Sequence, residues 1–596
     1  MMQDTCTCDS IDRVCSAYEE GSSALFLSGR SLHDIDLAAD GRLRPIMEIL
    51  RSALRQRFGM VLVTYSRAAG LDHDAATLDA KDLDSIERVL RGWGLLGTPT
   101  HDQETSSVLR GIFRGAREPA ASRRWSDGRE MRFAFLLEFC DHLVPSGTTT
   151  GLAPDELATA VELAHLLGNS LALRASGNLV MLHTEHGGID DLVARALRRV
   201  RLPLPNREAK QRFVKAAIDV YDKAKLEEGL DSPHIARATE NTPNRGLEGL
   251  LRASHRADRP LTAASLTEQR ARDVEQMSEG TLTVLDSERV AGIRLVGVNI
   301  RVPMTALERF SQALRAGDEA SPANVLLVGA QGIGKTDLAM LLARNANVTA
   351  YQMHSPKSSL VGETERKSRL QQLILREAAP NVAFVDEITE AFPLQRSDFD
   401  GDSGASRAVT GELLSALADE TRRGRSLLVA TTNCPWRMGA AMRSRFTVLP
   451  LLHPARVDFP DILVTIAKRI DPDLDLNPDD ERVQEAAREF YRKGATPRHV
   501  RAALGQARLL HGDIDADTAL FAARDLTPVE DMVSTQYADL WAVKACTSRS
   551  FLPWTEEPES YPYPAHLDGI VDASNGEIDP DALSRRIEEL RPHANL

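Results

Sequence analysis

The stretch that most constrains this chain covers residues 324–336 and reads NVLLVGAQGIGKT. Residues 325–328 form a short apolar run of the kind that a buried parallel strand needs. Residues 329–336 then fit the pattern G-x-x-x-x-G-K-[ST] at every fixed position, and residues 337–344 predict a helix. The order of strand, glycine-rich loop and helix predicts a phosphate-binding loop and therefore a nucleotide site.

The residue types in this loop suit a bound triphosphate. Glycines let successive backbone N–H groups turn towards a phosphate, and the helix N-terminus adds a partial positive charge. We expect Lys335 to reach the β- and γ-phosphates and the Thr336 hydroxyl to coordinate Mg²⁺. The residues expected to bind the nucleotide are Gly329, Ala330, Gln331, Gly332, Ile333, Gly334, Lys335, Thr336 and Asp337.

Length and composition limit the class of protein. The chain has 596 residues, which predicts two to four domains, and its hydrophobic content of 42% is typical of globular proteins. A net charge of -14 disfavours a protein that coats nucleic acid. No apolar run approaches the ~20 residues of a membrane helix, and no signal segment is visible, so we expect a cytoplasmic protein.

Three of the six cysteines lie near the start of the sequence. Cys6, Cys8 and Cys15, with His33 further on, lack the paired spacing of a zinc site. A frayed N-terminus is therefore the expectation there, with a metal site as the alternative.

The first half alternates strand-like and helix-like segments, which predicts a parallel α/β sheet. Strands are expected at residues 24–28, 60–65, 132–144 and 178–183, and helices at residues 45–57, 154–167 and 206–227. Residues 66–70 stand where a phosphate loop is expected but contain no lysine, whereas Glu138 and Asp141 resemble an acidic strand end. Residues 233–279 predict a helical lid. The half is interpreted as a degenerate ATPase-like module, and an unrelated α/β domain remains the alternative.

Two further strands of the second half end in polar residues. Residues 381–387 read NVAFVDE, so Asp386 is placed to hold Mg²⁺ from its outer shell and Glu387 to polarise the attacking water. Residues 427–432 read LLVATT and lead to Asn433, whose neutral amide is expected to orient the water or contact the γ-phosphate. A turn asparagine is the alternative for Asn433.

Three arginines complete the candidate catalytic set. In the stretch MRSRF, Arg445 is the first choice and Arg443 the second for an arginine finger that acts on the nucleotide of a neighbouring protomer. Arg498 follows Pro497 at an expected helix start, where it can report the nucleotide state from a helical lid. An ordinary surface arginine is the alternative for Arg498.

Together these motifs resemble the AAA branch of the AAA+ ATPases. GAQGIGKT matches the Walker A motif of that family, FVDE its Walker B motif, TTN its sensor 1, SRF its arginine-finger box and ATPR a sensor 2 arginine. The resemblance covers about residues 286 to 525, and the first half is similar only in pattern. It implies Mg-ATP as the bound cofactor, hydrolysis of ATP, and a homo-oligomeric, hexameric ring.

Two segments depart from the family pattern or lie beyond it. SLVGETE, at residues 359–365, resembles the family's pore loop, but Leu360 stands at the aromatic position and offers less grip on a threaded polypeptide. Residues 551–564, FLPWTEEPESYPYP, concentrate aromatic residues and prolines before a helix expected at residues 579–590. This segment is expected either to pack on its own domain or to bind a partner.

The expected organisation is two tandem AAA-type α/β modules, the first degenerate. The boundaries are 1–232 for the first α/β domain, 233–280 for its helical lid, 281–322 for a linker and entry helix, 323–455 for the ATPase α/β domain, 456–530 for its lid and 531–596 for a C-terminal extension. The expected function is remodelling of a protein substrate or complex by a ring ATPase. The alternatives are a nucleotide-switched scaffold that does not thread its substrate and, less favoured, a DNA-associated motor.

Overall fold

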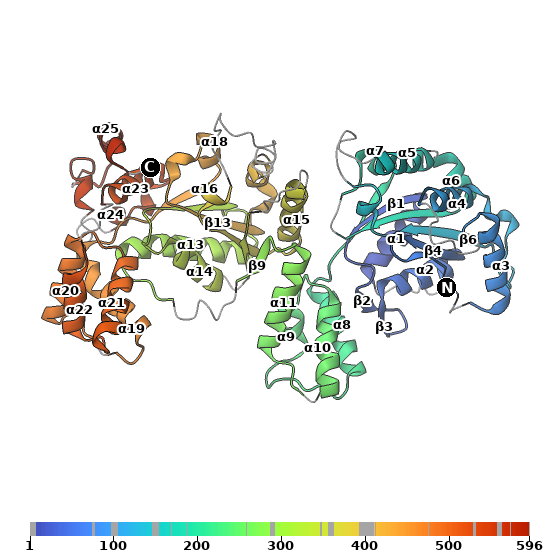
Figure 1. Cartoon of the computed structure of the whole chain (residues 1–596), viewed down its shortest axis with the longest axis horizontal. Coiled ribbons are helices and arrows are strands. Elements are labelled where there is room, and N and C mark those ends of the chain that lie inside the picture. Colours follow the sequence, from blue (N-terminus) through green and yellow to red (C-terminus); the bar gives the residue numbers. More distant parts are fainter. Residues whose placement is uncertain are drawn as a thin grey trace. The chain divides into compact units, whose positions relative to one another are not determined.

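The computed structural model divides into two compact units, Met1–Met277 and Ser278–Leu596. It describes residues 8–73, 75, 78–96, 105–145, 154–168, 170–185, 188–257, 259–285, 293–345, 348–355, 363–392, 411, 413–474, 476–527, 532–556, 563–572 and 574–594. Each unit combines a parallel sheet with flanking helices and a separate helical bundle (Figure 1). This confirms the α/β class expected from the sequence.

The first unit begins with a helix and then alternates strands and helices. Its α/β part contains α1 (Asp9–Glu19), β1 (Ala24–Gly29), β2 (Ile35–Leu37), β3 (Leu43–Pro45), α2 (Ile46–Phe58), β4 (Met60–Ser66), β5 (Gly70–Asp72), α3 (Ala80–Gly92), α4 (Thr105–Arg117), β6 (Arg132–Leu137), α5 (Pro154–Gly168), α6 (Ser170–Ser176), β7 (Leu179–Thr184), α7 (Asp191–Ala194) and β8 (Arg198–Leu202). Its bundle contains α8 (Arg207–Val220), α9 (Ser232–Ala238), α10 (Asn244–Ala257) and α11 (Ala263–Met277).

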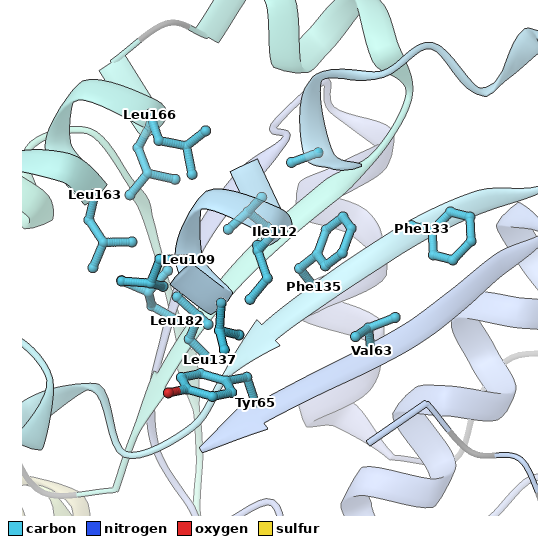
Figure 2. Close-up of a cluster of buried hydrophobic side chains, with 14 of the residues drawn as sticks. Val63, Tyr65, Leu109, Ile112, Phe133, Phe135, Leu137, Leu163, Leu166 and Leu182 are labelled. Carbon is cyan, nitrogen blue, oxygen red and sulfur yellow. The ribbon is translucent and has the colours of Figure 1, made fainter. Parts of the chain in front are cut away.

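Both faces of the first sheet are buried. On one face, Val63, Phe133, Phe135 and Leu182 pack with helices α3, α4 and α5 (Figure 2). The intervening strand residues point to the opposite face, where α1 and α2 cover them. Because every strand residue meets a covered face, the strands read as continuous apolar runs, which is why the sequence indicated a parallel sheet.

The second unit repeats this plan. Its elements are β9 (Leu282–Val284), α13 (Val298–Ala316), β10 (Asn324–Val328), α14 (Lys335–Asn345), β11 (Thr349–Met353), α15 (Glu363–Glu377), β12 (Asn381–Val385), α16 (Ile388–Ala391), β13 (Ser426–Thr432), α18 (Ala440–Arg443), β14 (Thr447–Pro450), a bundle of α19 (Phe459–Ile470), α20 (Glu481–Arg492), α21 (Pro497–His511) and α22 (Ala516–Asp525), and then α23 (Met532–Ala545), α24 (Pro553–Glu556) and α25 (Pro580–Leu590).

The two sheets have the same order of parallel strands. The first sheet runs β5-β4-β6-β7-β1-β8 and the second, from the corresponding edge, runs β9-β11-β12-β13-β10-β14. Strands β1, β4, β6, β7 and β8 thus correspond to β10, β11, β12, β13 and β14. The edge strands β5 and β9 are both antiparallel to their neighbours, although β5 follows its neighbour in the chain and β9 precedes it. Because the order is the same, each strand residue of the first unit can be assigned a corresponding residue in the second unit.

This order corrects the expected place of a phosphate loop in the first unit. Residues 66–70 follow β4, the counterpart of β11, and form the turn into β5. The loop that corresponds to residues 329–336 follows β1, where the chain enters the β2–β3 hairpin instead. The prediction was wrong because strand order within a sheet depends on crossover connections, which local sequence patterns do not report.

Several element boundaries also differ from expectation. Helix α8 ends at Val220 rather than at Glu227, and its buried face packs with α9 and α10, so it belongs to the helical bundle. Strand β9, expected in a linker, completes the second sheet. Helix α13 begins at Val298 rather than at Thr305 and accommodates Pro303 in its first two turns. Proline near a helix start removes few hydrogen bonds, which permits the longer helix.

The N-terminal helix corrects a further expectation. Cys8 and Cys15 are buried against the first sheet, with Cys15 inside α1, so from Cys8 onwards the chain is packed rather than frayed. Cys6 lies outside the described residues. Within the described part of the chain, no group of three or more His, Cys, Asp or Glu residues is arranged to hold a metal ion. A search of the same part finds no helix with the length and apolar character needed to span a membrane.

Candidate nucleotide site

The glycine-rich loop connects β10 to α14 at the carboxyl end of the second sheet. Gly332 and Gly334 have φ values of 79° and 102°, a conformation that side-chain-bearing residues rarely adopt. Gly329 is required for a different reason, because a Cβ there would lie 2.0 Å from the carbonyl oxygen of Leu451. Of the two fixed glycines, Gly334 therefore allows the loop conformation, and Gly329 allows close packing against Leu451, which follows the neighbouring strand β14.

Lys335 is held inside this loop. Its Nζ donates hydrogen bonds to the carbonyl oxygens of Gly329 at 2.9 Å and Ala330 at 2.7 Å. The side chain is buried, and this burial lowers the pKa of Lys335 although Glu387 and Asp386 favour its charged form. An ammonium group that bonds only neutral carbonyls still has its charge available for an anion, as a phosphate-binding lysine requires.

A cluster of oxygen donors lies at the start of α14. The Thr336 hydroxyl donates to Asp386 Oδ1 at 3.0 Å, and the Thr431 hydroxyl donates to the same oxygen at 2.6 Å. A carboxylate beside a hydroxyl is the hard oxygen set that Mg²⁺ prefers. The residues present therefore fit the divalent cation expected at Thr336 and Asp386.

Glu387 follows Asp386 in a strained conformation. Its φ of 45° places it in the left-handed region, and its backbone N–H donates to the Thr431 hydroxyl at 2.9 Å. Burial raises the pKa of Glu387, while Lys335 opposes the shift. A left-handed non-glycine residue beside a reaction site is a device that aims a side chain at the cost of backbone strain.

Asn433 lies beside Glu387 at the end of β13. The Asn433 backbone N–H donates to Glu387 Oε2 at 3.2 Å, whereas the Asn433 side-chain oxygen is buried without a hydrogen-bond partner. An unpaired buried amide oxygen is costly, and a hydrogen-bond donor such as a water molecule beside it would remove that cost. This supports the expectation that Asn433 is more than a turn residue.

The helical bundle closes one side of the site. The Arg498 backbone N–H donates to the Gly332 carbonyl oxygen at 3.3 Å, and Arg469 forms an ion pair with Asp337 at 3.3 Å. Between sheet and bundle lies a cavity of about 390 Å³, whose lining includes Lys335, Thr336, Asp386, Glu387, Arg498 and Arg501. Its volume and mixture of cations and carboxylates suit a nucleotide with its metal ion.

The two arginines of the MRSRF stretch differ in their surroundings. The Arg443 guanidinium donates to the carbonyl oxygens of Pro435 and Met438 and lies 5.7 Å from the Trp541 ring centroid. Arg445 donates to the Ala441 carbonyl oxygen at the surface. Neither side chain lines the cavity of its own unit. Arg443 thus supports the local structure, and Arg445 is the more accessible cation.

Sequence reasoning missed three residues of this site. Thr431 bonds both Asp386 and the Glu387 backbone, Arg469 ties the bundle to α14, and Arg501 lines the cavity one helical turn after Arg498. Thr431 lies in the TTN motif and was within reach of motif analysis, whereas Arg469 carries no motif. Leu360, the residue at the pore-loop aromatic position, lies outside the described residues.

The corresponding edge of the first sheet has different chemistry. When the two sheets are aligned by strand register, Glu138 takes the position of Asp386, Phe139 that of Glu387 and Glu185 that of Asn433. Phe139 shares the left-handed conformation of Glu387, with a φ of 54°, but has no carboxylate. His33 pairs with Glu138 at 3.1 Å, and the Ser31 hydroxyl donates to Glu185 at 2.5 Å. The polar groups at this edge are thus paired with one another.

A buried ion-pair cluster follows β1, where the second unit has its glycine-rich loop. The Arg30 guanidinium pairs with Asp34 at 2.6 Å and with Asp36 at 2.5 Å, and all three residues are buried. Asp34 also accepts the backbone N–H groups of Asn244 at 3.1 Å and Arg245 at 2.8 Å, at the start of α10. A carboxylate of the chain itself therefore caps the bundle helix that corresponds to α21.

Comparison with known proteins identifies part of the second unit. Residues 325–452 match the model of the ATPase family associated with various cellular activities (AAA). The chain is 25% identical over 393 residues to a cell division cycle protein 48 homolog of Archaeoglobus fulgidus, covering 60% of this chain and 49% of that protein. It is also 32% identical over 139 residues to an ATPase family protein 2 homolog of Caenorhabditis elegans, covering 23% of this chain and 18% of that protein.

A third relative is spastin of Bos taurus, which is 29% identical over 177 residues, covering 29% of this chain and 28% of that protein. These matches span half or less of the length of each relative. The matched region contains the glycine-rich loop, Asp386, Glu387 and Asn433. Residues 325–452, within the second unit, are therefore similar to the AAA family of ATPases.

Proposed function

We propose that the second unit binds Mg-ATP and hydrolyses it, and that the protein uses this reaction to remodel a protein substrate or complex. The observation that carries the proposal is the convergence of Lys335, Thr336, Asp386, Glu387 and Asn433 on one cavity or its rim. These residues come from three strand ends that are separate in sequence and adjacent in the sheet. Such convergence of charge and hydrogen-bond donors is the arrangement that phosphoryl transfer requires.

Each side chain has a role in this proposal. Lys335 and the loop N–H groups hold the β- and γ-phosphates, and Thr336 and Asp386 hold the metal, which when bound screens the charge of the phosphates. Glu387 accepts a proton from the attacking water, and Asn433 orients that water through its unpaired amide oxygen. Arg498 reports from the bundle whether the cavity is filled.

We further propose that the first unit is a degenerate module of the same kind. The support is its identical order of parallel strands together with the replacement of each chemical residue at the strand ends. Glu138 and Glu185 are bonded to His33 and Ser31, so these carboxylates serve contacts within the unit. The match that covers 60% of the chain is longer than the second unit alone, in keeping with this relationship.

The arginine box supports action between the protomers of a ring. Because Arg445 does not line the cavity of its own unit, its charge is available to the nucleotide of a neighbouring copy. In the first unit the register of β8 places Ala194 and Ala196 at the positions of Arg443 and Arg445. Neither of these two positions in the first unit therefore carries a cation, although Arg195 lies between them.

A regulatory ATPase that switches with its nucleotide, without threading substrate, is the second candidate. It is favoured by Leu360, because leucine offers a smaller contact surface than the aromatic residue of the family pattern. Stimulation of the ATPase rate by an unfolded protein supports remodelling by threading, and stimulation by one specific folded partner supports the switch. Stimulation by DNA instead would contradict both.

Substitution of Glu387 tests the proposed chemistry. Glu387→Gln should retain ATP binding but hydrolyse ATP about 10²- to 10⁴-fold more slowly, because the general base is lost while the phosphate contacts remain. The measurements are phosphate release and nucleotide affinity. Glu390→Gln, an exposed change on α16, is the matched control and should hydrolyse at the wild-type rate. Equal rates in the wild type and Glu387→Gln would exclude Glu387 as the base.

A further inference from the structure

Helix α23 of the C-terminal extension joins two functional parts of the second unit. Its described residues pack on the sheet, since Ala538 belongs to the core beneath β10 and Thr547, just beyond the helix, exchanges hydrogen bonds with Val448 of β14. In the aromatic and proline-rich segment 551–564, Phe551 packs against the same core and Trp554 is buried, whereas residues 557–562 lie outside the described residues. Besides this packing, two opposite sides of α23 make polar and aromatic contacts with other parts of the second unit.

One side of α23 holds the hinge between the sheet and the helical bundle. Asp539 is fully buried and accepts the backbone N–H of His453 at 3.2 Å, and it pairs with His566 at 3.3 Å. His453 lies between β14 and α19, where the chain leaves the sheet for the bundle. The His453 ring lies 3.1 Å from the carbonyl oxygen of Ala495, next to the residue that caps α21 and two residues before Pro497. A buried carboxylate therefore holds the connection between the sheet and the bundle that carries Arg498.

The other side of α23 holds the arginine box. The Trp541 ring lies 5.7 Å from the Arg443 guanidinium, and Tyr537 packs edge-to-face on Trp436 with ring centroids 4.9 Å apart. Trp436 belongs to the 3-10 turn Pro435–Arg437, whose carbonyl group at Pro435 accepts from Arg443. Positions 537 and 541 share one helix face because they are four residues apart, while position 539 lies on a different side.

We propose that α23 connects the joint between sheet and bundle in each protomer to the arginine box of the same protomer. The nucleotide bound by a protomer sets the position of its bundle, and through α23 that position changes the arginine finger that the protomer presents to the nucleotide of its neighbour. This inference rests on the proposed ring and on a finger that acts between protomers. Asp539 and Trp541 are positioning residues, which act through His453 and Arg443 rather than on the nucleotide. A single rigid helix with both contacts transmits a displacement of one end to the other, because packed helices shift as units.

A mixed oligomer isolates this link from nucleotide binding. Donor protomers carry Lys335→Ala, which binds no ATP but offers an intact finger, and acceptor protomers carry Arg445→Ala, which binds ATP but offers none. Activity in the mixture then arises where an acceptor site meets a donor finger. Asp539→Asn is added to the donor alone, so any effect on turnover must reach the finger from a hinge that binds no nucleotide.

The expected result is a fall in kcat of about two- to thirtyfold, with the KM for ATP unchanged. Trp541→Leu in the donor should act in the same way, and Trp541→Phe should restore most of the rate because it keeps the aromatic face over Arg443. Asp568→Asn in the donor is the matched control, since this aspartate of the same extension is exposed. Should the Asp539→Asn donor not assemble, His566→Gln instead removes the imidazole that lies 3.3 Å from Asp539.

The outcomes separate the link from the proposal on which it rests. An inactive parent mixture, in verified mixed oligomers, would overturn the finger between protomers and the link with it. An active parent mixture whose rate is unaffected by Asp539→Asn, His566→Gln or Trp541→Leu in the donor would overturn the link alone. A fall in rate with a matching rise in KM would also overturn it, because the effect would then lie in ATP binding.

Discussion

The two units of this chain share the order of their parallel strands but differ at nearly every strand end. In the second unit, the segments that begin at Gly329 and Asp386 line a cavity, and the Asn433 backbone N–H donates to Glu387 beside it. At the corresponding positions the first unit has Gly29, Glu138 and Glu185. The glycine alone is common to both, and the reason is steric: a Cβ at Gly29 would lie 2.6 Å from the Leu202 carbonyl oxygen, as one at Gly329 would approach Leu451.

The comparison shows that sheet architecture and chemistry depend on different residues. Continuous apolar runs, whose residues point alternately to the two covered faces of the sheet, maintain the fold. The residues just beyond each strand determine what can bind. In the first unit those residues bond one another, with Asp34 at the N-terminus of α10 in a place suited to an anion. A carboxylate of the chain itself thus holds bundle and sheet together without a ligand.

The largest effect that tests this contrast is expected from Lys335→Ala. Nucleotide binding by the whole chain should be lost, because Lys335 carries the main charge that meets the phosphates, whereas Arg30, after the corresponding strand of the first unit, is paired with Asp34. Titration with a fluorescent nucleotide should give one site per wild-type chain and none in the variant. Arg30→Met, in the first unit, should leave the single site intact. A second tight site that survives Lys335→Ala would contradict the contrast between the units.

The next effect concerns the arginine box, which has alanines as its counterparts in the first unit. Arg445→Ala should slow hydrolysis by about 10³-fold at nearly unchanged ATP affinity, the order expected for a lost finger. Phosphate release and nucleotide affinity, measured on the same oligomers, check both parts. Arg437→Ala is the matched control, because Arg437 is an exposed arginine in the turn beside the box. A monomer of the wild type that hydrolyses ATP at the full rate would remove the requirement for a neighbouring protomer.

The smallest effect is a change in the stability of the first unit. Lys210 is fully buried, and burial lowers its pKa to about 7. An unfolded lysine keeps a pKa of about 10.4, so between these values the unfolded chain binds more protons and stability rises with pH. Lys210→Met should abolish this rise in stability with pH. The measurement is the free energy of opening from hydrogen exchange of the α8 amides at pH values between about 7 and 9. Lys215→Met, an exposed change on the same helix, should preserve it, and a rise that persists in Lys210→Met would assign it to another group.

The sequence alone was sufficient for the α/β class, the glycine-rich loop between strand and helix, the acidic strand end at Asp386 and Glu387, and the similarity of residues 325–452 to the AAA family. These features are local, because a loop that approaches phosphate needs glycines at fixed spacing and a buried strand needs an apolar run. The same reasoning identified Asn433 as a strand-end residue, although only the structure shows that its side-chain oxygen is buried and unpaired.

Only the tertiary structure decided which strand of the first unit occupies the place of β10. From the sequence, residues 66–70 after β4 were interpreted as the place of a phosphate loop, whereas the sheet order assigns that place to the residues after β1. The structure also brought Asp34 to α10, Arg469 to Asp337 and Asp539 to His453, pairs that are far apart in the chain. Long-range pairs of this kind have no sequence period or fixed spacing, because crossover connections and the packing of helices on the sheet determine which residues meet.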